Sequence, residues 1–134
     1  MAKSKRIPIN PGWPHYNKWT LPPAVKKGNM LFISGIDATE RDPVTGEIKA
    51  TGDMGEQCRN IFQKIDRILK LAGGSWDDVV KTVDYVTTWE NYKATAQVRR
   101  DFFGTEYGAA TGILVKGLVG NGALIEIDAV AVLD

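Results

Sequence analysis

Two carboxylates near the end of the chain are the residues best suited to chemistry. Glu126 and Asp128 lie two positions apart in an otherwise apolar segment, residues 123–133. Because side chains alternate sides along a β-strand, both carboxylates are expected on the same face. Acidic groups on a largely apolar face need partners or serve a site. Glu126 is therefore the leading catalytic candidate, with an assembly ion pair as the alternative, whereas a structural pair is favoured for Asp128.

The sequence offers few residues suited to other types of reaction. His15 is the only histidine and lies in a proline-rich segment, which argues against Ser-His-Asp and Cys-His arrangements. No His/Cys cluster has the spacing of metal ligands, and no glycine loop would cradle a phosphate, so neither a metal nor a cofactor is expected. Cys58, the only cysteine, falls on the apolar stripe of a predicted helix and is interpreted as a buried hydrophobic residue rather than a reactive thiol.

Hydrophobic periodicity predicts the elements that position these side chains. Apolar residues recur every three or four positions over residues 54–72, and Gly73-Gly74 is expected to end that helix. A second helix is predicted with Ala94, Val98 and Phe102 as its inner row, and Arg99 as a solvated residue. The predicted elements, in order, are a hairpin of residues 24–26 and 30–34, a helix at 54–72, a strand at 79–87, a helix at 89–103, and strands at 111–118 and 123–133, the last being the longest.

The two predicted helices must cover the same face of a mixed sheet, because only one stripe of each is apolar. The fold class is therefore α+β, with the other face of the sheet left open. In the final strand, that open face combines Glu126 and Asp128 with Leu124, Val130 and Val132. Such a face is too apolar for water, so self-association is predicted to bury it. Residues 30–33 form a continuous apolar run and are expected to be buried on both faces.

The N-terminal part, residues 1–23, is predicted to be an irregular arm. Its prolines forbid a helix and disfavour a central strand. It also concentrates four aromatic rings, Trp13, His15, Tyr16 and Trp19, which would be costly to leave in water. We therefore expect the arm to be pinned against the domain or a neighbouring subunit. Gly35, which follows the apolar run, is predicted to allow a close approach to the backbone.

Size and composition bound the class of protein. A chain of 134 residues suits a single domain spanning 1–134, and 43% hydrophobic with 25% charged residues is ordinary for a globular protein. A net charge of +1 gives no field that would favour nucleic acid or an acidic membrane. The single cysteine, the charged first residues and the lack of an apolar run of about 20 residues predict a cytoplasmic location.

Several stretches together resemble the Rid (YjgF) family, which includes endoribonuclease L-PSP-like proteins. They cover roughly residues 24–133 in the family's order: GNMLFISG at 28–35, DPVTGEI at 42–48, the segments 57–72 and 77–82, FFG at 102–104, and GALIEIDA at 122–129. The resemblance implies a chorismate-mutase-like fold, a variant of the ferredoxin-like arrangement. In that fold three subunits join their sheets into a barrel-like core, with the helices outside and a cleft at each interface.

The resemblance also implies cofactor-free deaminase chemistry on reactive enamines and imines. In that chemistry a glutamate positions or activates water, and its position corresponds to Glu126. An arginine holds the substrate carboxylate, but its position here is Thr111, which supplies neither charge nor a fork of donors. The family's cleft tyrosine corresponds to Leu21, so Tyr16 and Trp19 are the candidates to take its place. Thr111, Gly35 and Trp89 complete the predicted binding residues.

Three functional hypotheses follow. The first is a hydrolase or deaminase that acts on a small C–N compound through Glu126, on water or on an imine nitrogen. The second is a metabolite-binding homotrimer without catalysis, motivated by the missing arginine. The third is a ribonuclease or translation inhibitor, against which the near-neutral charge and the lack of a histidine pair argue. The expected partners are a small molecule and further copies of the chain, with no nucleic acid and no membrane.

Overall fold

The computed structural model describes residues 5–134. Its helices are α1 (Met54–Ala72) and α2 (Thr95–Phe103), with short 3-10 turns at Pro14–Lys18, Trp76–Asp78 and Tyr92–Ala94. The strands are β1 (Ile7–Ile9), β2 (Ala24–Lys27), β3 (Met30–Asp37), β4 (Thr39–Arg41), β5 (Ile48–Ala50), β6 (Val79–Val86), β7 (Ala109–Leu114) and β8 (Ile125–Val132). The predicted order of helices and strands is confirmed, with β1, β4 and β5 in addition.

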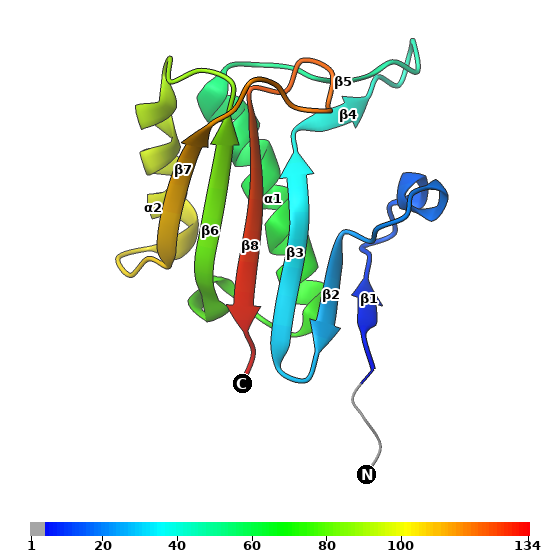
Figure 1. Cartoon of the computed structure of the whole chain (residues 1–134), viewed down its shortest axis with the longest axis vertical. Helices are drawn as coiled ribbons and strands as arrows, with labels where there is room; N and C mark the ends of the chain where they lie inside the picture. The colour runs from blue at the N-terminus through cyan, green and yellow to red at the C-terminus, as the bar shows by residue number, and fades with distance from the viewer. Residues whose placement is uncertain (1–4) are drawn as a thin grey trace.

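Six strands form one sheet in the order β1-β2-β3-β8-β6-β7. All neighbouring pairs are antiparallel except β6 and β7, which are parallel. Since β8 is antiparallel to both β3 and β6, these two strands run in the same direction. The chain passes from β3 through α1 to β6 and from β6 through α2 to β7, moving the same way across the sheet. Right-handed crossovers then place both helices on one face, behind the strands in Figure 1.

Helix α1 confirms its predicted apolar stripe and both of its ends. Asp53 caps its start, because its carboxylate accepts from the backbone N–H of Glu56. The Glu56 carboxylate in turn accepts from the backbone N–H of Asp53. Gly73 ends it in the left-handed conformation, with φ of 85°. Helix α2 is shorter than predicted, because Asn91 takes a positive φ of 58° and interrupts the segment before it. Ala94 is consequently exposed, and Thr95 occupies the inner row.

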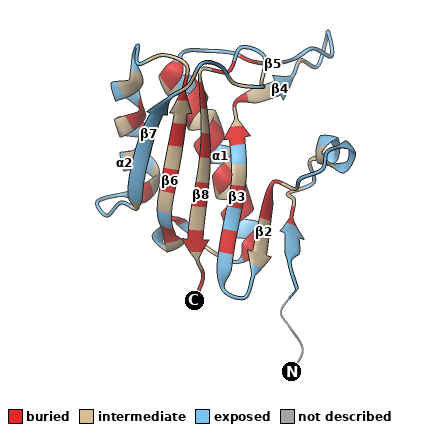
Figure 2. Cartoon of the chain, viewed as in Figure 1, coloured by how far each residue is buried: buried red, intermediate tan, exposed pale blue. Residues whose placement is uncertain are grey.

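The two faces of the sheet differ sharply in burial (Figure 2). Along β8, Ile125, Ile127, Ala129 and Ala131 pack beneath the helices and are at most 2% exposed, whereas the alternating residues are only half-buried. The expectation that residues 30–33 are buried on both faces is wrong for the single chain, because no helix covers the open face. Phe32 is 47% exposed there. An apolar open face is therefore present on β3 and β8, as the pattern predicted.

Strand β3 carries a β-bulge opposite β8. Ile33 pairs with Ala129 and Ile36 with Ile127, so β3 holds one more residue than its partner over this stretch. The extra backbone lies at Ser34 and Gly35. Ser34 ties it to the arm, since its N–H donates to the Pro23 carbonyl and its hydroxyl to the Pro22 carbonyl. The bulge thus joins the arm to the middle of the sheet.

Several predicted boundaries need correction. The arm is not wholly irregular, because β1 pairs with β2 and a 3-10 turn follows. The strand predicted at 111–118 begins at Ala109 and ends at Leu114, so Lys116 lies in the following loop. The final strand has eight residues, as do β3 and β6, and is not the longest.

Candidate active site

Glu126 is the second residue of β8 and lies directly against the bulge of β3. A Cβ atom built on Gly35 would lie 2.7 Å from Glu126 Oε2 and 2.9 Å from its Cδ, so the glycine makes room for the carboxylate. The prediction that Gly35 permits a close approach is therefore confirmed. Partial burial raises the pKa of Glu126 above its usual range, and the nearby carboxylates of Asp37 and Asp128 raise it further. A carboxyl group tuned toward neutral pH suits acid–base work.

A second carboxylate, Asp37, faces Glu126 across the β3–β8 ladder. One of its oxygens, Oδ1, accepts from the backbone N–H of Thr39 at 2.9 Å and from the Thr39 hydroxyl at 2.6 Å. On the other side of Glu126, Asp128 accepts from the hydroxyl of Tyr85 at 2.8 Å. Three carboxylates therefore occupy neighbouring strand positions, and among residues 5–134 no hydrogen bond or ion pair joins any of them to a cationic side chain.

The arm supplies an aromatic wall. Around the 3-10 turn, three rings cluster together: the ring centroid of Tyr16 is 4.6 Å from that of His15 and 4.8 Å from that of Trp19, and the last two are 5.1 Å apart. Burial raises the pKa of Tyr16 to about 12, aided by the carboxylates of Asp37 and Glu126, so the phenol stays protonated. Burial lowers the pKa of His15, and nearby Lys64 and Arg41 lower it further, which favours the neutral imidazole.

The far end of this wall is held by helix α1. The guanidinium of Arg67 lies over the Trp13 ring, 5.3 Å from its centroid, and donates to the Pro11 carbonyl at 3.3 Å. Asn10 stabilises the same turn, because its Oδ1 accepts from the Trp13 N–H at 2.7 Å. The predicted pinning of the arm against its own domain is confirmed.

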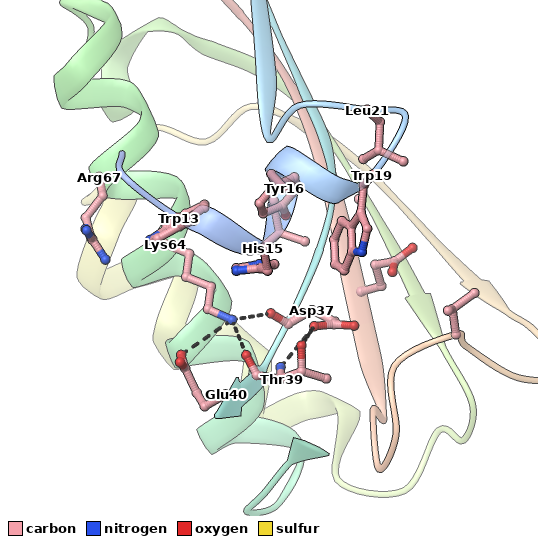
Figure 3. A pocket seen from close by; sticks show the side chains of 14 residues that line it. Trp13, His15, Tyr16, Trp19, Leu21, Asp37, Thr39, Glu40, Lys64 and Arg67 are labelled. Atoms are coloured by element: carbon pink, nitrogen blue, oxygen red, sulfur yellow. Dashed lines mark hydrogen bonds and ion pairs between the residues drawn. The ribbon is translucent and has the colours of Figure 1, made fainter. Parts of the chain in front are cut away.

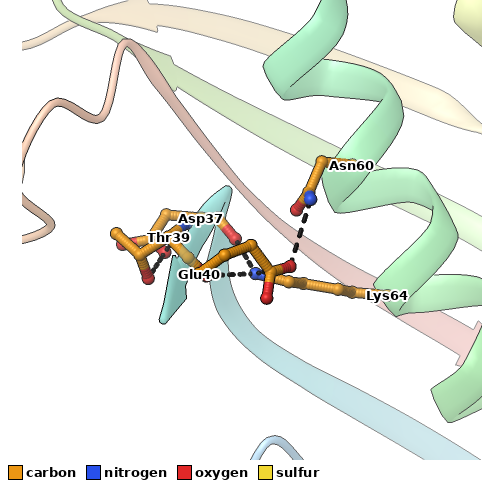
Figure 4. A network of polar contacts seen from close by, with 5 residues as sticks. All are labelled: Asp37, Thr39, Glu40, Asn60 and Lys64. Atoms are coloured by element: carbon orange, nitrogen blue, oxygen red, sulfur yellow. Dashed lines mark hydrogen bonds and ion pairs between the residues drawn. The ribbon is translucent and has the colours of Figure 1, made fainter. Parts of the chain in front are cut away.

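Lys64 of α1 lies under the wall, but its ammonium is already engaged (Figure 4). Its Nζ donates to the carbonyls of Asp37 and Thr39, both at 2.8 Å, and forms an ion pair with Glu40 at 3.5 Å. Glu40 also accepts from the Asn60 amide at 3.1 Å. Lys64 therefore fixes the β3–β4 corner, and its three donors have protein partners.

These groups enclose a cavity of about 460 Å³ between the arm, the end of β3 and helix α1 (Figure 3). Four of the predicted site residues line it together: Tyr16, Trp19, Gly35 and Glu126. Its size is within the range of small-molecule sites. His15, Asp37 and Lys64 also line it, and sequence reasoning did not select them, because only the bulge and the fold of the arm bring them to Glu126.

Thr111 and Trp89, the two other predicted site residues, lie outside this cavity. Thr111 is exposed on the edge strand β7, where its hydroxyl accepts from Lys81 Nζ at 2.7 Å. Trp89 lies beside Tyr92, with ring centroids 5.2 Å apart, and both rings adjoin Gly112 of β7. Strands β6 and β8 separate this edge from β3 within one chain.

A buried ion pair beneath α2 was missed by the sequence reading. Arg99 was expected to be solvated, but its side chain is only 16% exposed and pairs with Asp84 at 2.5 Å. The Tyr92 hydroxyl donates to the same Asp84 oxygen at 2.6 Å. The interpretation of Cys58 is confirmed, since it is fully buried and burial raises the pKa of its thiol to about 12.

Among residues 5–134, no cluster of three or more His, Cys, Asp and Glu side chains could hold a metal ion. Within the same part of the chain, neither helix combines the length and apolar character that crossing a membrane requires.

The topology defines a chorismate-mutase-like α+β domain, as predicted. The chain belongs to the Rid (YjgF) family, because the model of the family described as endoribonuclease L-PSP matches residues 16–133. The chain is 37% identical to a RutC family protein of Pyrococcus horikoshii over 108 residues, 81% of this chain and 82% of that protein. It is 36% identical over 109 residues to a protein of Acinetobacter baylyi named 3-aminoacrylate deaminase RutC, covering 81% and 83%.

Solved structures agree with this assignment. A Pseudomonas aeruginosa protein of unknown function superposes with a TM-score of 0.83 at 29% identity, covering 98% of this chain and 94% of that one. RidA from an Antarctic Psychrobacter superposes with a TM-score of 0.75 at 26% identity, covering 99% and 100%. Both the sequence motifs and the coordinates therefore place the chain in one family.

Proposed function

We propose that this protein is a cofactor-independent deaminase that hydrolyses an imine or enamine in the cavity beside Glu126. The observation that carries the proposal is the placement of Glu126: its carboxylate lies against the Gly35 bulge, lines the cavity and has a raised pKa. The relative from Acinetobacter baylyi, whose name is 3-aminoacrylate deaminase, supports the same chemistry.

In the proposed reaction Glu126 acts first as a base and then as an acid. Its carboxylate takes a proton from water while the water oxygen attacks the carbon of a protonated C=N group, which gives a neutral carbinolamine. The protonated Glu126 then transfers its proton to the amine nitrogen. The C–N bond breaks, ammonia leaves, and the hydroxyl group passes its proton to the Glu126 carboxylate to become a carbonyl. Glu126 then releases this proton to the ammonia, which departs as ammonium. A pKa raised toward neutrality helps both transfers, because an effective acid–base group titrates near the working pH.

We also propose that the working form is a homotrimer. The open face carries exposed apolar side chains that a single chain leaves in water, including Phe32, Met30 and Ile113. Thr111 and Trp89 lie at the other edge of the sheet, so they would reach the Glu126 cavity only from a neighbouring copy. Light scattering is expected to give three times the chain mass at micromolar concentration; a stable monomer would remove this part of the proposal.

A non-catalytic metabolite-binding trimer is the second candidate. It is favoured by Thr111, which stands where the family's arginine is expected. Thr111 offers only a hydroxyl, which accepts from Lys81 Nζ, in place of a charged fork of donors. In that case ligands bind in the cavity and leave unchanged.

Ammonia release from a panel of imines and enamines generated in situ tests the proposal. Glu126→Gln is expected to lower turnover by about 10²–10⁴-fold, the usual contribution of a positioned acid–base group. Glu106→Gln is the matched control, because Glu106 is exposed in the turn after α2, outside the cavity.

Undiminished turnover by Glu126→Gln would exclude its proposed role. Binding without ammonia release from any compound would favour the binding trimer. Thr111→Arg is a further variant, expected to gain turnover of carboxylate-bearing imines if the rest of the cleft is intact.

A further inference from the structure

Carboxylates outnumber cationic side chains around the cavity. Glu126 and Asp37 face each other across two strands, and no ion pair neutralises either carboxylate among the described residues. The lining holds three carboxylates, Asp37, Glu40 and Glu126, but only two cationic side chains, Lys64 and Arg67. Lys64 is paired with Glu40. The balance presented to a ligand is therefore negative.

The opposite wall is built from electron-rich rings. Tyr16 and Trp19 meet edge to face at 4.8 Å, and both line the same cavity as Glu126. The faces of tryptophan and tyrosine attract cations, and this attraction increases when the cation is withdrawn from water. Trp19 is 54% exposed in the single chain, so part of its ring surface is free for a ligand.

We propose that this cavity selects a positively charged small molecule without a carboxylate, such as the iminium ion of a cyclic ketone, whose nitrogen lies outside the ring, held between Glu126 and Asp37 on one side and the Tyr16 and Trp19 rings on the other. The proposal rests on the proposed function and names the substrate class of the same site. A volume of about 460 Å³ is ample for a five- or six-membered ring.

Two physical effects disfavour a carboxylate-bearing substrate. A substrate carboxylate placed beside Glu126 and Asp37 would be repelled by both, and Lys64 and Arg67 offset this repulsion only in part, because Glu40 is a third carboxylate of the lining. A bound cation, in contrast, stabilises the ionised form of Glu126 and so favours the carboxylate that takes the proton from water.

Binding of inert probes tests the charge preference separately from catalysis. N,N-dimethylpyrrolidinium carries a permanent positive charge on a five-membered ring, and cyclopentanecarboxylate is an anion of similar size. Calorimetry and tryptophan fluorescence with the full-length protein are expected to show at least tenfold tighter binding of the cation. Glu126→Gln and Trp19→Leu should each weaken that binding by about threefold to thirtyfold. Glu106→Gln and Tyr107→Leu, which alter an exposed acid and an exposed ring outside the cavity, should leave it unchanged.

The proposal is overturned if the anion binds as well as the cation, if neither probe binds, or if the cation binds equally to Glu126→Gln. Its failure is distinguishable from failure of the proposed function. Cation binding without ammonia release from any imine refutes the deaminase and leaves the charge preference intact. Turnover of carboxylate-bearing imines without a preference for cations does the reverse.

Discussion

The buried pair of Arg99 and Asp84 allows a stability prediction that needs no substrate. The Asp84 side chain is 1% exposed, and its Oδ2 receives hydrogen bonds from Arg99 and from the Tyr92 hydroxyl. Its other oxygen, Oδ1, is buried without a partner. Arg99 also donates to the Thr82 hydroxyl at 3.1 Å. Removing Arg99 therefore leaves a carboxylate in the core with only one neutral donor.

Arg99→Met is expected to lower the free energy of unfolding by about 3–5 kcal/mol, because breaking a buried ion pair strands an uncompensated charge. For a chain of this length the unfolding temperature should fall by roughly 10–20 °C. Urea unfolding followed by circular dichroism measures the loss. Native and variant proteins must be compared at one protein concentration, since self-association adds to apparent stability.

The molecule offers a matched control in Arg59 and Asp101. This pair joins α1 to α2 at the same 2.5 Å separation as the pair between α2 and β6, but the two side chains are 42% and 40% exposed. Arg59→Met should therefore cost far less than Arg99→Met, because water solvates the remaining carboxylate. Adding Asp84→Asn to Arg99→Met should recover more than half of the loss, since the buried charge is gone. Equal losses for the two arginine variants would refute the reasoning from burial.

Three further outcomes are expected. Gly35→Ala should slow ammonia release at least tenfold with little change in unfolding temperature, because the new methyl displaces the flexible Glu126 carboxylate rather than backbone; unchanged turnover would contradict this placement. Burial, and then the neighbouring carboxylates, raise the folded-state pKa of Glu126. Above about pH 4 the folded chain therefore keeps a proton that the unfolded chain has released. The contribution of this proton to stability is lost as the pH rises further. The unfolding free energy of native protein minus that of Glu126→Gln should thus decline as pH rises above about 4, until the folded-state pKa is passed, and a flat difference would argue against the raised pKa. Gln57→Leu should cost about 3 kcal/mol in urea unfolding, since the buried amide satisfies two loop carbonyls and one N–H; a loss below about 1 kcal/mol would show that water replaces those bonds.

Much of the fold could be predicted because local patterns and tertiary packing agree. The apolar stripe of α1 and the alternation in β8 each report one buried face, and both faces meet in the core. The short strands β1, β4 and β5 were not predicted, because three residues give too little periodicity to distinguish a strand from a loop. The second helix was overextended, since a left-handed Asn91 is not evident from residue type alone.

The candidate site was only partly accessible to sequence reasoning. Glu126 and Gly35 were found, because a carboxylate in an apolar strand and a glycine after one are local signals. Asp37 was not selected, because its position opposite Glu126 depends on the register shift at the bulge. Arg99 was misassigned for a similar reason: its partner, Asp84, is fifteen residues away on a strand, so nothing in the helical spacing indicates the pair.

The arm is held at two points, through Arg67 near Trp13 and through Ser34 near Pro22. The segment between these two points is fixed at both of its ends, so it cannot swing open about either of them. We therefore expect molecules to enter and leave the cavity past rotating rings such as Trp19, on the nanosecond scale of exposed side chains, without the slower hinge motions that limit many enzymes. For the proposed deaminase, the chemical step rather than product escape would then limit turnover.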